Sequence, residues 1–402
     1  MLADEAKKNL TKGILPFWMK LTDHEYGGFY GSVDYELNVD KKADKGTILV
    51  SRIMWLFSQA YIVFRDREYL DTAKHAYEYF HGYCYDEEHG GLYWSTTYDG
   101  RPSDTVKHTC VMAYGIYGLV AYYKASKDIA VLYEAEDLYC FIEDKCTDDN
   151  GYLEEFDRFF NVKDNEKLSD MLALGGVYAY RTMNTMLHLL EAYTELFLEN
   201  ESEDVRDKLL SLLKIFADRV YNPEKERMEL FFDSDYNSLM DMQSYGHDIE
   251  CAWLIDYAVR VLKTKTDKDD IVYDNCDINS LFENINDMTN HLRDSVYKRA
   301  FVSDYLVSNS VQGFADDTRV WWVQAEAVNG FSKGYKYNPE RTEYKDAVVR
   351  LLKYIRGHFV DIRSGEWFNE LDKHDVPVRK ELAGQWKCPY HNGRMWLELM
   401  KY

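Results

Sequence analysis

Two histidines stand at the predicted starts of helices, where an imidazole can serve as a proton acceptor. His247 lies in the segment SYGHDIE, residues 244–250, and His391 directly follows the segment WKCPY, residues 386–390. Because the positive end of a helix dipole disfavours imidazolium, we expect both rings to be neutral near pH 7. Glu250 shares a helix face with His247 and can orient its ring. Either histidine alone could be a capping residue, but two in matching positions of different repeats favour acid/base catalysis.

A polar stripe and an isolated cation interrupt helices that are otherwise apolar. Arg181, Asn184 and His188 fall on one face of a predicted helix. A histidine in such a place is either a satisfied core residue or part of a stripe that faces a ligand. Arg52 stands in the very apolar segment of residues 49–56, where an unpaired guanidinium is costly. We therefore expect Arg52 either to hold a structural carboxylate or to bind an anionic transition state.

Aromatic residues make up 15% of the chain, more than a core needs. Most of them belong to the core, but we expect Trp321, Trp322 and Trp386 to line a funnel and to stack on the C–H faces of a sugar. The carboxylates expected near the same mouth are those of Asp248, Glu250 and Glu326. A pair of them could instead serve as the acid and base of a glycosidase.

Several well-known chemistries have no motif in this sequence. A P-loop, a dinucleotide-binding glycine fingerprint, a Gly-x-Ser-x-Gly elbow and a His-Glu-x-x-His pair are all absent from it. The eleven histidines show no metal-ligand spacing, so we expect neither a metal nor a cofactor. The net charge of −22 argues against binding to nucleic acid or to an anionic membrane surface.

The cysteines and the N-terminus indicate the compartment. Seven cysteines without a Cys-x-x-Cys pair are typical of reduced thiols in a cytosol. The first residues contain no apolar signal-peptide core, and the longest uncharged run, residues 110–123, is too short to span a membrane. The sequence therefore predicts a cytoplasmic protein that does not bind membranes.

The elements that must position these residues are mainly helices, since only 6 prolines and 22 glycines occur in 402 residues. Apolar residues with a 3.6-residue period predict about twelve helices. The expected ranges are 4–21, 47–65, 68–84, 106–124, 129–146, 181–199, 202–220, 246–263, 278–298, 319–336, 342–359 and 391–401.

Short glycine-aromatic segments recur between alternate helices and predict β-hairpins. Residues 27–30, 90–94 and 365–368 look alike, and residues 150–153 form a weaker fourth copy. The first spacings are about sixty residues, close to one sixth of the chain, which indicates a closed array of repeated units. We therefore predict an all-α fold, an (α/α)6 barrel of about twelve helices with short hairpins at one mouth, built as a single catalytic domain over residues 1–402.

Four segments of the chain resemble the N-acylglucosamine 2-epimerase superfamily, and within it the cellobiose 2-epimerases. They are residues 43–46 (ADKG), 244–250 (SYGHDIE), 319–326 (RVWWVQAE) and 386–391 (WKCPYH). The resemblance covers essentially the whole chain and implies the same (α/α)6 barrel. It also implies an isomerase that inverts C2 of the reducing-end glucose of β-1,4-linked disaccharides without a cofactor. Cellobiose would give glucosyl-mannose and lactose would give epilactose, with mannobiose as a further candidate substrate.

The resemblance implies roles for the candidate residues. His247 and His391 match the acid/base histidines. The supporting polar residues match Arg52, Asn184, His188 and Glu250, with Glu326 among the substrate-binding residues. The stacking tryptophans match Trp321 or Trp322, and Trp386. Two places depart from the pattern: Tyr180-Arg181 replaces an acidic or amide residue followed by lysine, and Cys110-Val111-Met112 replaces Tyr-Asn-Gln.

The chemistry of C2 inversion agrees with these residue types. The sugar ring must open, the C2 proton must leave, and a proton must return on the opposite face of a cis-enediolate. Arg52 and His188 can stabilise the enediolate oxygen, and two histidines on opposite walls can share the proton transfers.

Three alternatives stay open. They are a monosaccharide member of the superfamily (an N-acylglucosamine 2-epimerase or a mannose isomerase), an (α/α)6 glycoside hydrolase that uses carboxylates, and a barrel that binds sugar without catalysis. We expect the chain to be a monomer or a weak homodimer.

Overall fold

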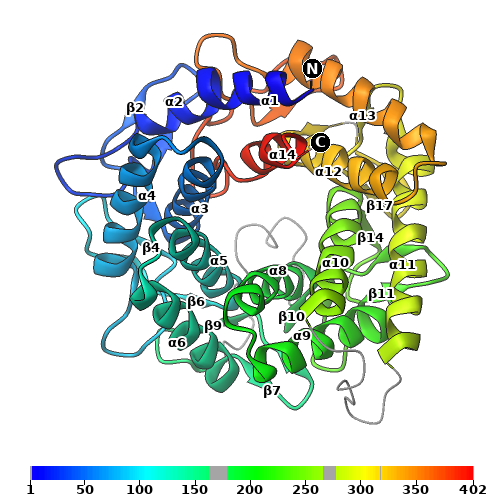
Figure 1. Cartoon of the computed structure of the whole chain (residues 1–402), viewed down its shortest axis with the longest axis horizontal. Helices are drawn as coiled ribbons and strands as arrows, with labels where there is room; N and C mark the ends of the chain where they lie inside the picture. Colours follow the sequence, from blue (N-terminus) through cyan, green and yellow to red (C-terminus); the bar gives the residue numbers. More distant parts are fainter. Residues whose placement is uncertain (1, 163–178, 266–277, 317, 402) are drawn as a thin grey trace. The chain divides into compact units, whose positions relative to one another are not determined.

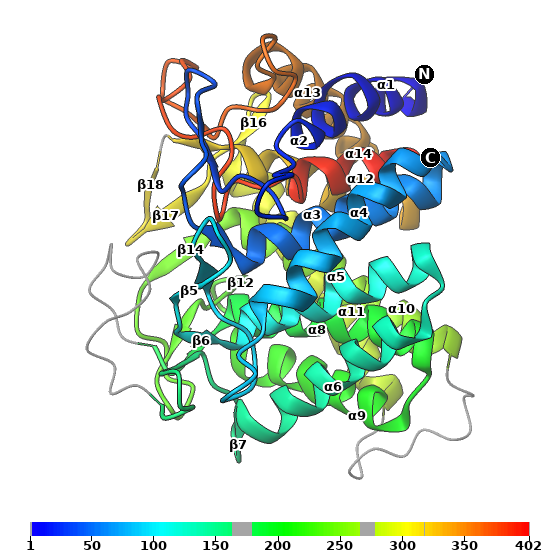
Figure 2. The same ribbon diagram turned by 90° about the vertical axis from the view of Figure 1, so that its left-hand side faces the viewer.

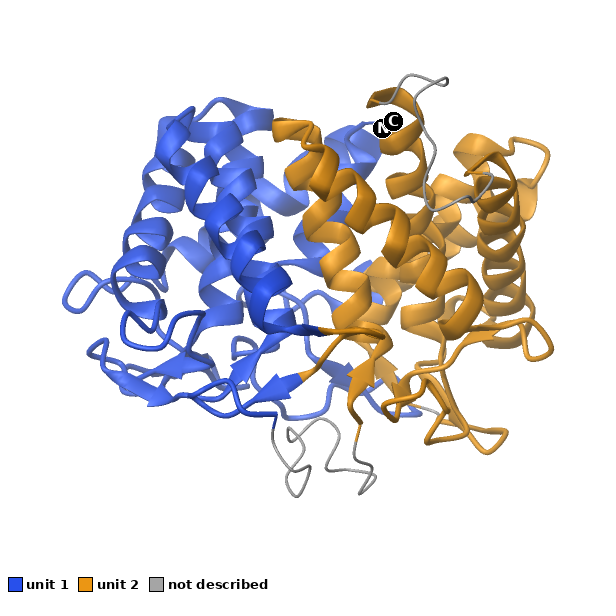
Figure 3. Ribbon diagram, turned by 90° about the horizontal axis from the view of Figure 1, so that it is seen from below, with its two compact units in different colours: residues 1–147, 155–163, 356–402 blue, residues 148–154, 164–355 orange. Residues whose placement is uncertain are grey.

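The computed structural model describes residues 2–162, 179–265, 278–316 and 318–401. Its contacts divide the chain into two compact units, which Figure 3 shows in different colours. Unit 1 contains residues 1–147, 155–163 and 356–402, and unit 2 contains residues 148–154 and 164–355. Each unit is described by itself.

Unit 1 contains the first six α-helices and the last one. The helices are α1 (Leu2–Asn9), α2 (Leu15–Met19), α3 (Thr47–Phe64), α4 (Arg67–Tyr79), α5 (Thr109–Ser126), α6 (Ile129–Lys145) and α14 (His391–Leu399), with π-helical turns η1 (Leu10–Ile14) and η2 (Phe80–Cys84). The strands are β1 (Ser32–Val33), β2 (Val39–Asp40), β3 (Lys45–Gly46), β4 (Ser95–Thr96), β5 (Pro102–Asp104), β6 (Lys107–His108), β9 (Glu155–Phe156) and β20 (Glu370–Leu371). The strands β3, β4 and β5 form one antiparallel sheet, and the pairs β1–β2 and β6–β9 form two more.

Unit 2 is likewise built from helices and short strands. Its helices are α8 (Met183–Asn200), α9 (Glu203–Ile215), α10 (Tyr245–Lys265), α11 (Ile278–Ala300), α12 (Trp321–Tyr337) and α13 (Thr342–Tyr354), with the π turn η3 (Phe216–Val220). Its strands are β8 (Gly151–Tyr152), β10 (Arg181–Thr182), β11 (Tyr221–Asn222), β12 (Arg227–Met228), β13 (Phe231–Phe232), β14 (Met242–Ser244), β15 (Phe301–Val302), β16 (Tyr305–Leu306), β17 (Asn309–Val311), β18 (Phe314–Ala315) and β19 (Arg319–Val320). The chain passes between the units after residues 147, 154, 163 and 355, and the first and last of these points lie within β7 (Thr147–Asp148) and η4 (Ile355–Phe359).

Each of the twelve expected helices is present in the described part of the chain, with ends that differ from the expected ones by only a few residues. The main difference lies at helix starts. Residues 107–108, 181–182 and 319–320, expected to be helical, form the short strands β6, β10 and β19 instead. The apolar pattern continues through these strands, so periodicity alone does not locate the true start.

Tight turns join successive helices into antiparallel pairs, as Figure 1 shows for α3 beside α4 and for α5 beside α6. In α3 and α5 the residue after the last helical turn, Arg65 or Lys127, adopts the left-handed conformation, with φ of 59° and 62°. The next residue, Asp66 or Asp128, caps the following helix through its side chain. One left-handed residue followed by one N-cap is enough to reverse the chain.

The two helices of a pair differ in burial. We call α3, α5, α8, α10, α12 and α14 the core helices, and their partners the cover helices. The core helix α3 is buried along most of its length and packs against α4, α5 and α14, and Figure 2 shows α3 and α4 side by side. The cover helix α4 buries only one stripe of side chains. By length and composition α3 could cross a membrane, but 72% of that stretch is buried inside the protein, as expected of a core helix.

A buried lysine fixes the start of α3. Lys45 stands two residues before the helix, and its Nζ donates to Oδ2 of Asp23 at 2.7 Å and to the carbonyl oxygen of Gly27 at 2.6 Å. Both charged groups are buried. Although burial opposes ionisation of Asp23, the hydrogen bonds from Lys45 and from the backbone outweigh it and lower the pKa of the carboxyl. We call this arrangement, a cation before a core helix that holds a hairpin carboxylate and a carbonyl, the hairpin clamp.

The clamp recurs in both units. Lys107, two residues before α5, donates to Oδ2 of Asp86 at 3.0 Å and to a carbonyl oxygen of the same turn at 2.9 Å. In unit 2, Arg181, two residues before α8, donates to Oδ2 of Asp148 at 2.6 Å and to the carbonyl oxygen of Tyr152 at 3.1 Å. Arg181 is therefore a clamp residue and does not belong to the polar helix face that the sequence predicted.

The three similar glycine-aromatic segments have the same hairpin geometry. Their β-bridges join Thr22 to Phe29, Tyr85 to Leu92 and Val360 to Trp367. The turns need left-handed backbone at Gly27, Gly90 and Gly365, with φ of 79°, 82° and 80°. Glycine adopts this conformation without steric cost, which explains why these segments look alike in the sequence.

Replacing Lys45 by methionine is expected to destabilise the protein by about 3 to 5 kcal/mol, because the carboxylate of Asp23 would be left buried and uncompensated. Urea unfolding followed by circular dichroism measures this loss. The matched control is Arg67→Met, which breaks an ion pair with Asp71 on the surface of α4, and it should cost less than about 1 kcal/mol. Equal losses in the two variants would contradict the structural role of the clamp.

Candidate active site

In unit 2, His247 is the third residue of α10, at the positive end of that helix. Its Nδ1 lies 2.8 Å from the Oγ of Ser244, and its ring contacts that of Trp322 at a centroid distance of 4.8 Å. Burial, together with the charge of His188 and against an opposing effect of Glu326, lowers the pKa of His247 to about 3. This pKa agrees with the neutral imidazole that the sequence predicted, but its main cause is burial and not the helix dipole.

The two adjacent tryptophans of α12 have different surroundings. Trp321 is 3% exposed and belongs to the core, whereas Trp322 is partly exposed and lies against His247. Gly246 makes this contact possible, because a Cβ at that position would come within 2.6 Å of the Trp322 ring. Of the two candidates, the structure brings Trp322 to the polar residues.

His188 lies in the middle of α8 and is buried. Its Nδ1 is 3.1 Å from Oε2 of Glu191, which is also buried and which the sequence analysis did not single out. Asn184, one helical turn earlier, is partly exposed. The spacing of three residues that drew attention to Glu250 after His247 would have found Glu191 as well.

Two carboxylates complete the polar group of unit 2. Glu250 on α10 and Glu326 on α12 are buried, and one oxygen of each lies within 4.8 Å of the other. Oε2 of Glu326 accepts a hydrogen bond from Nε1 of Trp253 at 2.9 Å. Trp253 was not predicted, because a tryptophan inside an apolar helix is most simply a core residue.

In unit 1, Arg52 is buried in the middle of α3. Its guanidinium lies over the rings of Tyr114 and Tyr390, at 4.2 and 4.6 Å from the centroids, and Nη1 donates to Sγ of Cys388 at 3.4 Å. Burial opposes the charge, but the two tyrosines and the thiol raise the pKa above its usual value. Within the described residues of unit 1 no carboxylate pairs with Arg52, so the structural carboxylate considered from the sequence is not found there.

His391 is the first residue of α14, as predicted, and is buried beside Tyr390 at a ring-centroid distance of 4.9 Å. Trp386, five residues earlier, is partly exposed, and its ring lies 5.6 Å from that of Trp94. Nε1 of Trp94 donates to Oε1 of Gln385 at 2.9 Å and so holds the two rings together. The sequence did not indicate Trp94, which belongs to one of the repeated hairpins.

A single buried carboxylate fixes the segment that carries His391. Oε1 of Glu366 accepts from Nζ of Lys387 at 3.0 Å and from Nδ2 of Asn392 at 2.5 Å, and its Oε2 accepts from Nε1 of Trp18 at 2.7 Å. These bonds tie residues on both sides of His391 to one point. Lys387, four residues before α14, thus holds a buried carboxylate as the clamp cations do.

Several candidate residues share one register relative to the clamp positions. The residue seven places after Lys45, Arg181, Gln243 and Arg319 is Arg52, His188, Glu250 and Glu326, respectively. Because each of these helices starts two residues after the clamp position, each candidate is the sixth residue of its own helix, at an equivalent height and on an equivalent face. The same count after Lys107 gives Tyr114, the ring that covers Arg52. This register could have indicated Tyr114 from the sequence.

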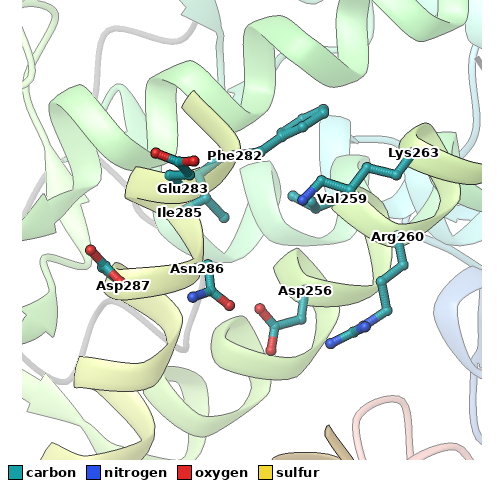
Figure 4. Close-up of a pocket in the computed structure, with 9 residues that line it drawn as sticks. All are labelled: Asp256, Val259, Arg260, Lys263, Phe282, Glu283, Ile285, Asn286 and Asp287. Atoms are coloured by element: carbon teal, nitrogen blue, oxygen red, sulfur yellow. The ribbon is translucent and has the colours of Figure 1, made fainter. Parts of the chain in front are cut away.

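Unit 2 also has a surface pocket of about 450 Å3, which is lined by other residues (Figure 4). It lies between α10 and α11, and none of the predicted site residues lines it. Its lining includes Asp256, Arg260 and Lys263 from α10 and Phe282, Glu283 and Asp287 from α11.

Comparison with known proteins shows the family. The profile described as N-acylglucosamine 2-epimerase (GlcNAc 2-epimerase) matches residues 28–393. The chain belongs to the N-acylglucosamine 2-epimerase family. It is 42% identical to a cellobiose 2-epimerase of Eubacterium cellulosolvens over 98% of this chain and 97% of the relative. It is 41% identical to one of Ruminococcus albus over 100% and 98% of the two chains.

The fold of this epimerase is also similar to that of a solved structure over nearly its whole length. The cellobiose 2-epimerase of Bacillus thermoamylovorans B4167 superposes with a TM-score of 0.91 at 37% identity, over 99% of this chain and 98% of the other. The predicted (α/α)6 barrel fold and the predicted class of enzyme, an epimerase, are therefore confirmed.

One repeat of the epimerase departs from the clamp. At the position two residues before α10 stands Gln243 in place of a cation, and its Nε2 donates to Oδ2 of buried Asp248 at 2.8 Å. The backbone N–H of Met228 donates to Oδ1 of Asp248 at 2.9 Å. Burial raises the pKa of Asp248 to about 7, and these hydrogen bonds and Arg227 only partly offset it. The neighbour of His247 is thus a carboxyl that stays protonated in mildly acidic solution.

The substitution Asp248→Asn should make the stability of the epimerase less dependent on pH. An unfolded aspartate loses its proton near its usual pKa of 3.8, whereas folded Asp248 keeps it to about pH 7. Stability therefore falls as the pH rises through this window, by up to about 1.4 kcal/mol per pH unit, and the neutral asparagine lacks that loss. Urea unfolding of both proteins from pH 4 to 8 measures this effect. The free energy of unfolding of the variant should rise relative to that of the parent up to about pH 7. Parallel curves would contradict the assigned protonation.

Proposed function

We propose that this epimerase inverts C2 of the reducing-end glucose in β-1,4-linked disaccharides, converting cellobiose to glucosyl-mannose and lactose to epilactose. The observation that carries the proposal is the full-length similarity, at about two identical residues in five, to the cellobiose 2-epimerases of two bacteria. We further infer that the enzyme works in the cytoplasm without a cofactor, as a monomer or weak homodimer, and that mannobiose is a candidate third substrate.

In the proposed mechanism, His247 and His391 transfer the protons. The neutral ring of His247 accepts rather than donates a proton when the open-chain sugar is bound. The aldehyde at C1 acidifies the C2–H bond, so its removal gives a cis-enediolate. Return of a proton to the opposite face of C2 completes the inversion, and two bases from different helices can serve the two faces.

Arg52 and His188 stabilise the oxygen that becomes negative in the enediolate. A buried guanidinium that pairs with no carboxylate in the described residues of unit 1 can meet a developing anion without first giving up an ion pair. His188 can donate a hydrogen bond through Nε2 when its ring is doubly protonated, a form that the carboxylate of Glu191 at Nδ1 favours. Fixed donors of this kind act where charge develops.

The remaining candidates bind the sugar. Trp322 and Trp386 are partly exposed and can stack on the apolar faces of the two sugar rings. Asn184, Glu250 and Glu326 can form hydrogen bonds with hydroxyl groups. Trp321 is buried in the core, and we therefore assign the stacking role to Trp322.

Proton NMR of the purified enzyme with cellobiose in D2O tests the proposal. Glucosyl-mannose with deuterium at C2 is the expected product, because the proton abstracted from C2 exchanges with solvent. N-acetylmannosamine and mannose, in parallel samples, test the monosaccharide alternative. Release of free glucose would indicate instead a hydrolase acting through carboxylates such as Glu250 and Glu326, whose oxygens lie within 4.8 Å.

Alanine at His247 or at His391 should lower kcat for cellobiose by at least about a thousandfold, since each ring is assigned a proton transfer. The control is His374→Ala, which removes an exposed imidazole from a loop and should leave kcat unchanged. Circular dichroism confirms that all three variants keep their helices. Appreciable epimerisation by either of the first two variants would remove that histidine from the mechanism.

A further inference from the structure

His188 and Glu191 form a buried pair of side chains on α8. The two residues are one helical turn apart, their side chains are each 3% exposed, and Nδ1 of the imidazole lies 3.1 Å from Oε2 of the carboxylate. A carboxylate at such depth is costly unless hydrogen-bonded to a suitable partner. The helix thus places an acceptor for a proton on one specified nitrogen of the ring.

The elements packed against α8 determine what else acts on His188. The cover helix α9 turns only apolar side chains inward, namely Val205, Leu209, Leu210, Leu212 and Leu213. From the core helix α10 comes His247, which interacts electrostatically with His188, and Glu250 lies on the same helix. Glu326 of α12 acts in turn on His247.

His188 and His247 therefore have opposite environments. His247 has a hydroxyl group at Nδ1 and an indole ring beside it, and burial keeps it neutral. His188 has a carboxylate at Nδ1, which holds a proton on that nitrogen and favours the doubly protonated ring. Nε2 then carries a hydrogen that points away from Glu191. Groups of one type in contrasting environments commonly divide acid and base roles.

We propose that Glu191 is a positioning residue for epimerisation, which fixes the ring of His188 with its Nε2–H directed to the sugar oxygen that becomes negative in the enediolate. The inference rests on the proposed function of His188. Glu191 acts through His188 and does not itself touch the substrate. The proton on Nε2 is shared with the substrate oxygen as charge develops, and the carboxylate remains ionised throughout.

The first test is the pH dependence of epimerisation in Glu191→Gln. Without the negative charge His188 loses its second proton at lower pH, so the alkaline limb of the kcat profile should move to lower pH by about one unit or more. At neutral pH kcat for cellobiose should fall by about 10- to 100-fold while KM changes little. The matched control is Glu195→Gln, one turn further along α8, where Glu195 accepts from the hydroxyl of Tyr257, and it should keep the parent profile. A uniform loss at all pH values would indicate a merely structural role and overturn the proposal.

The second test measures the protonation of the His188 ring by NMR. In the parent protein labelled with [13Cε1]-histidine, the resonance of His188, assigned by its absence in His188→Gln, should titrate at higher pH than that of His247. Glu191→Gln should move the His188 midpoint to lower pH, and Glu191→Asp should move it less. The parent measurement stands even if a Glu191 variant does not fold, and a His188 midpoint at or below that of His247 would refute the assignment.

The tests separate this inference from the proposed function. If the parent enzyme epimerises no sugar, the proposed function fails, whereas the NMR titration still reports on the Glu191–His188 pair. If the parent is active and Glu191→Gln keeps its kcat and pH profile, only the positioning role fails.

Discussion

A buried cation held against a hairpin carboxylate sets the first residue of several core helices. Lys45, Lys107 and Arg181 cannot be left unpaired inside the protein, so each has one acceptable place, two residues before its helix. Once the start of a helix is set, its 3.6-residue period decides the direction of every later side chain. Arg52 and His188 are each the sixth residue of their helix and therefore take equivalent directions in α3 and α8. The hairpins have no chemical role of their own, but in this way they determine the direction of polar side chains such as Arg52 and His188.

The repeat that carries His247 lacks the clamp cation. Gln243 stands where lysine or arginine stands in the clamps of α3, α5 and α8, and the carboxyl of Asp248 accepts its hydrogen bonds from two neutral donors. A cation at this point would disfavour protonation of any nearby imidazole, whereas a neutral amide adds no charge. The departure from the repeated pattern thus coincides with the residue to which proton transfer is assigned, as is expected where function overrides local regularity.

The helices and the polar residues were predictable from the sequence because both depend on local pattern. The 3.6-residue period located α3, α10 and α14 closely, and the placement of His247 and His391 at helix starts followed from it. The strand before α8 was not predictable, since the pairing of β10 with β13 depends on residues far along the chain. Arg181 was for that reason assigned to the wrong element.

The choice between Trp321 and Trp322 needed the structure. Adjacent residues of a helix point about 100° apart, and only packing against α10 decides which of them faces inward. Gly246 settles it by leaving room for one indole, and a missing Cβ on another helix is not visible in the local pattern of α12. Glu191 was missed for another reason. A glutamate one turn after a histidine is common on exposed helices, and its burial appears only in the fold.

The helices at the two ends of the chain, α1 and α14, pack against each other within unit 1. Unit 1 therefore joins residues 1–147 to residues 356–402, whereas the last segment of unit 2 ends at residue 355. A ribosome synthesises a chain in the N- to C-terminal direction, so α1 emerges long before its partner α14 exists. The nascent chain must hold α1 without this contact until α14 has been made, and His391 takes its place only after every residue of unit 2 has been synthesised.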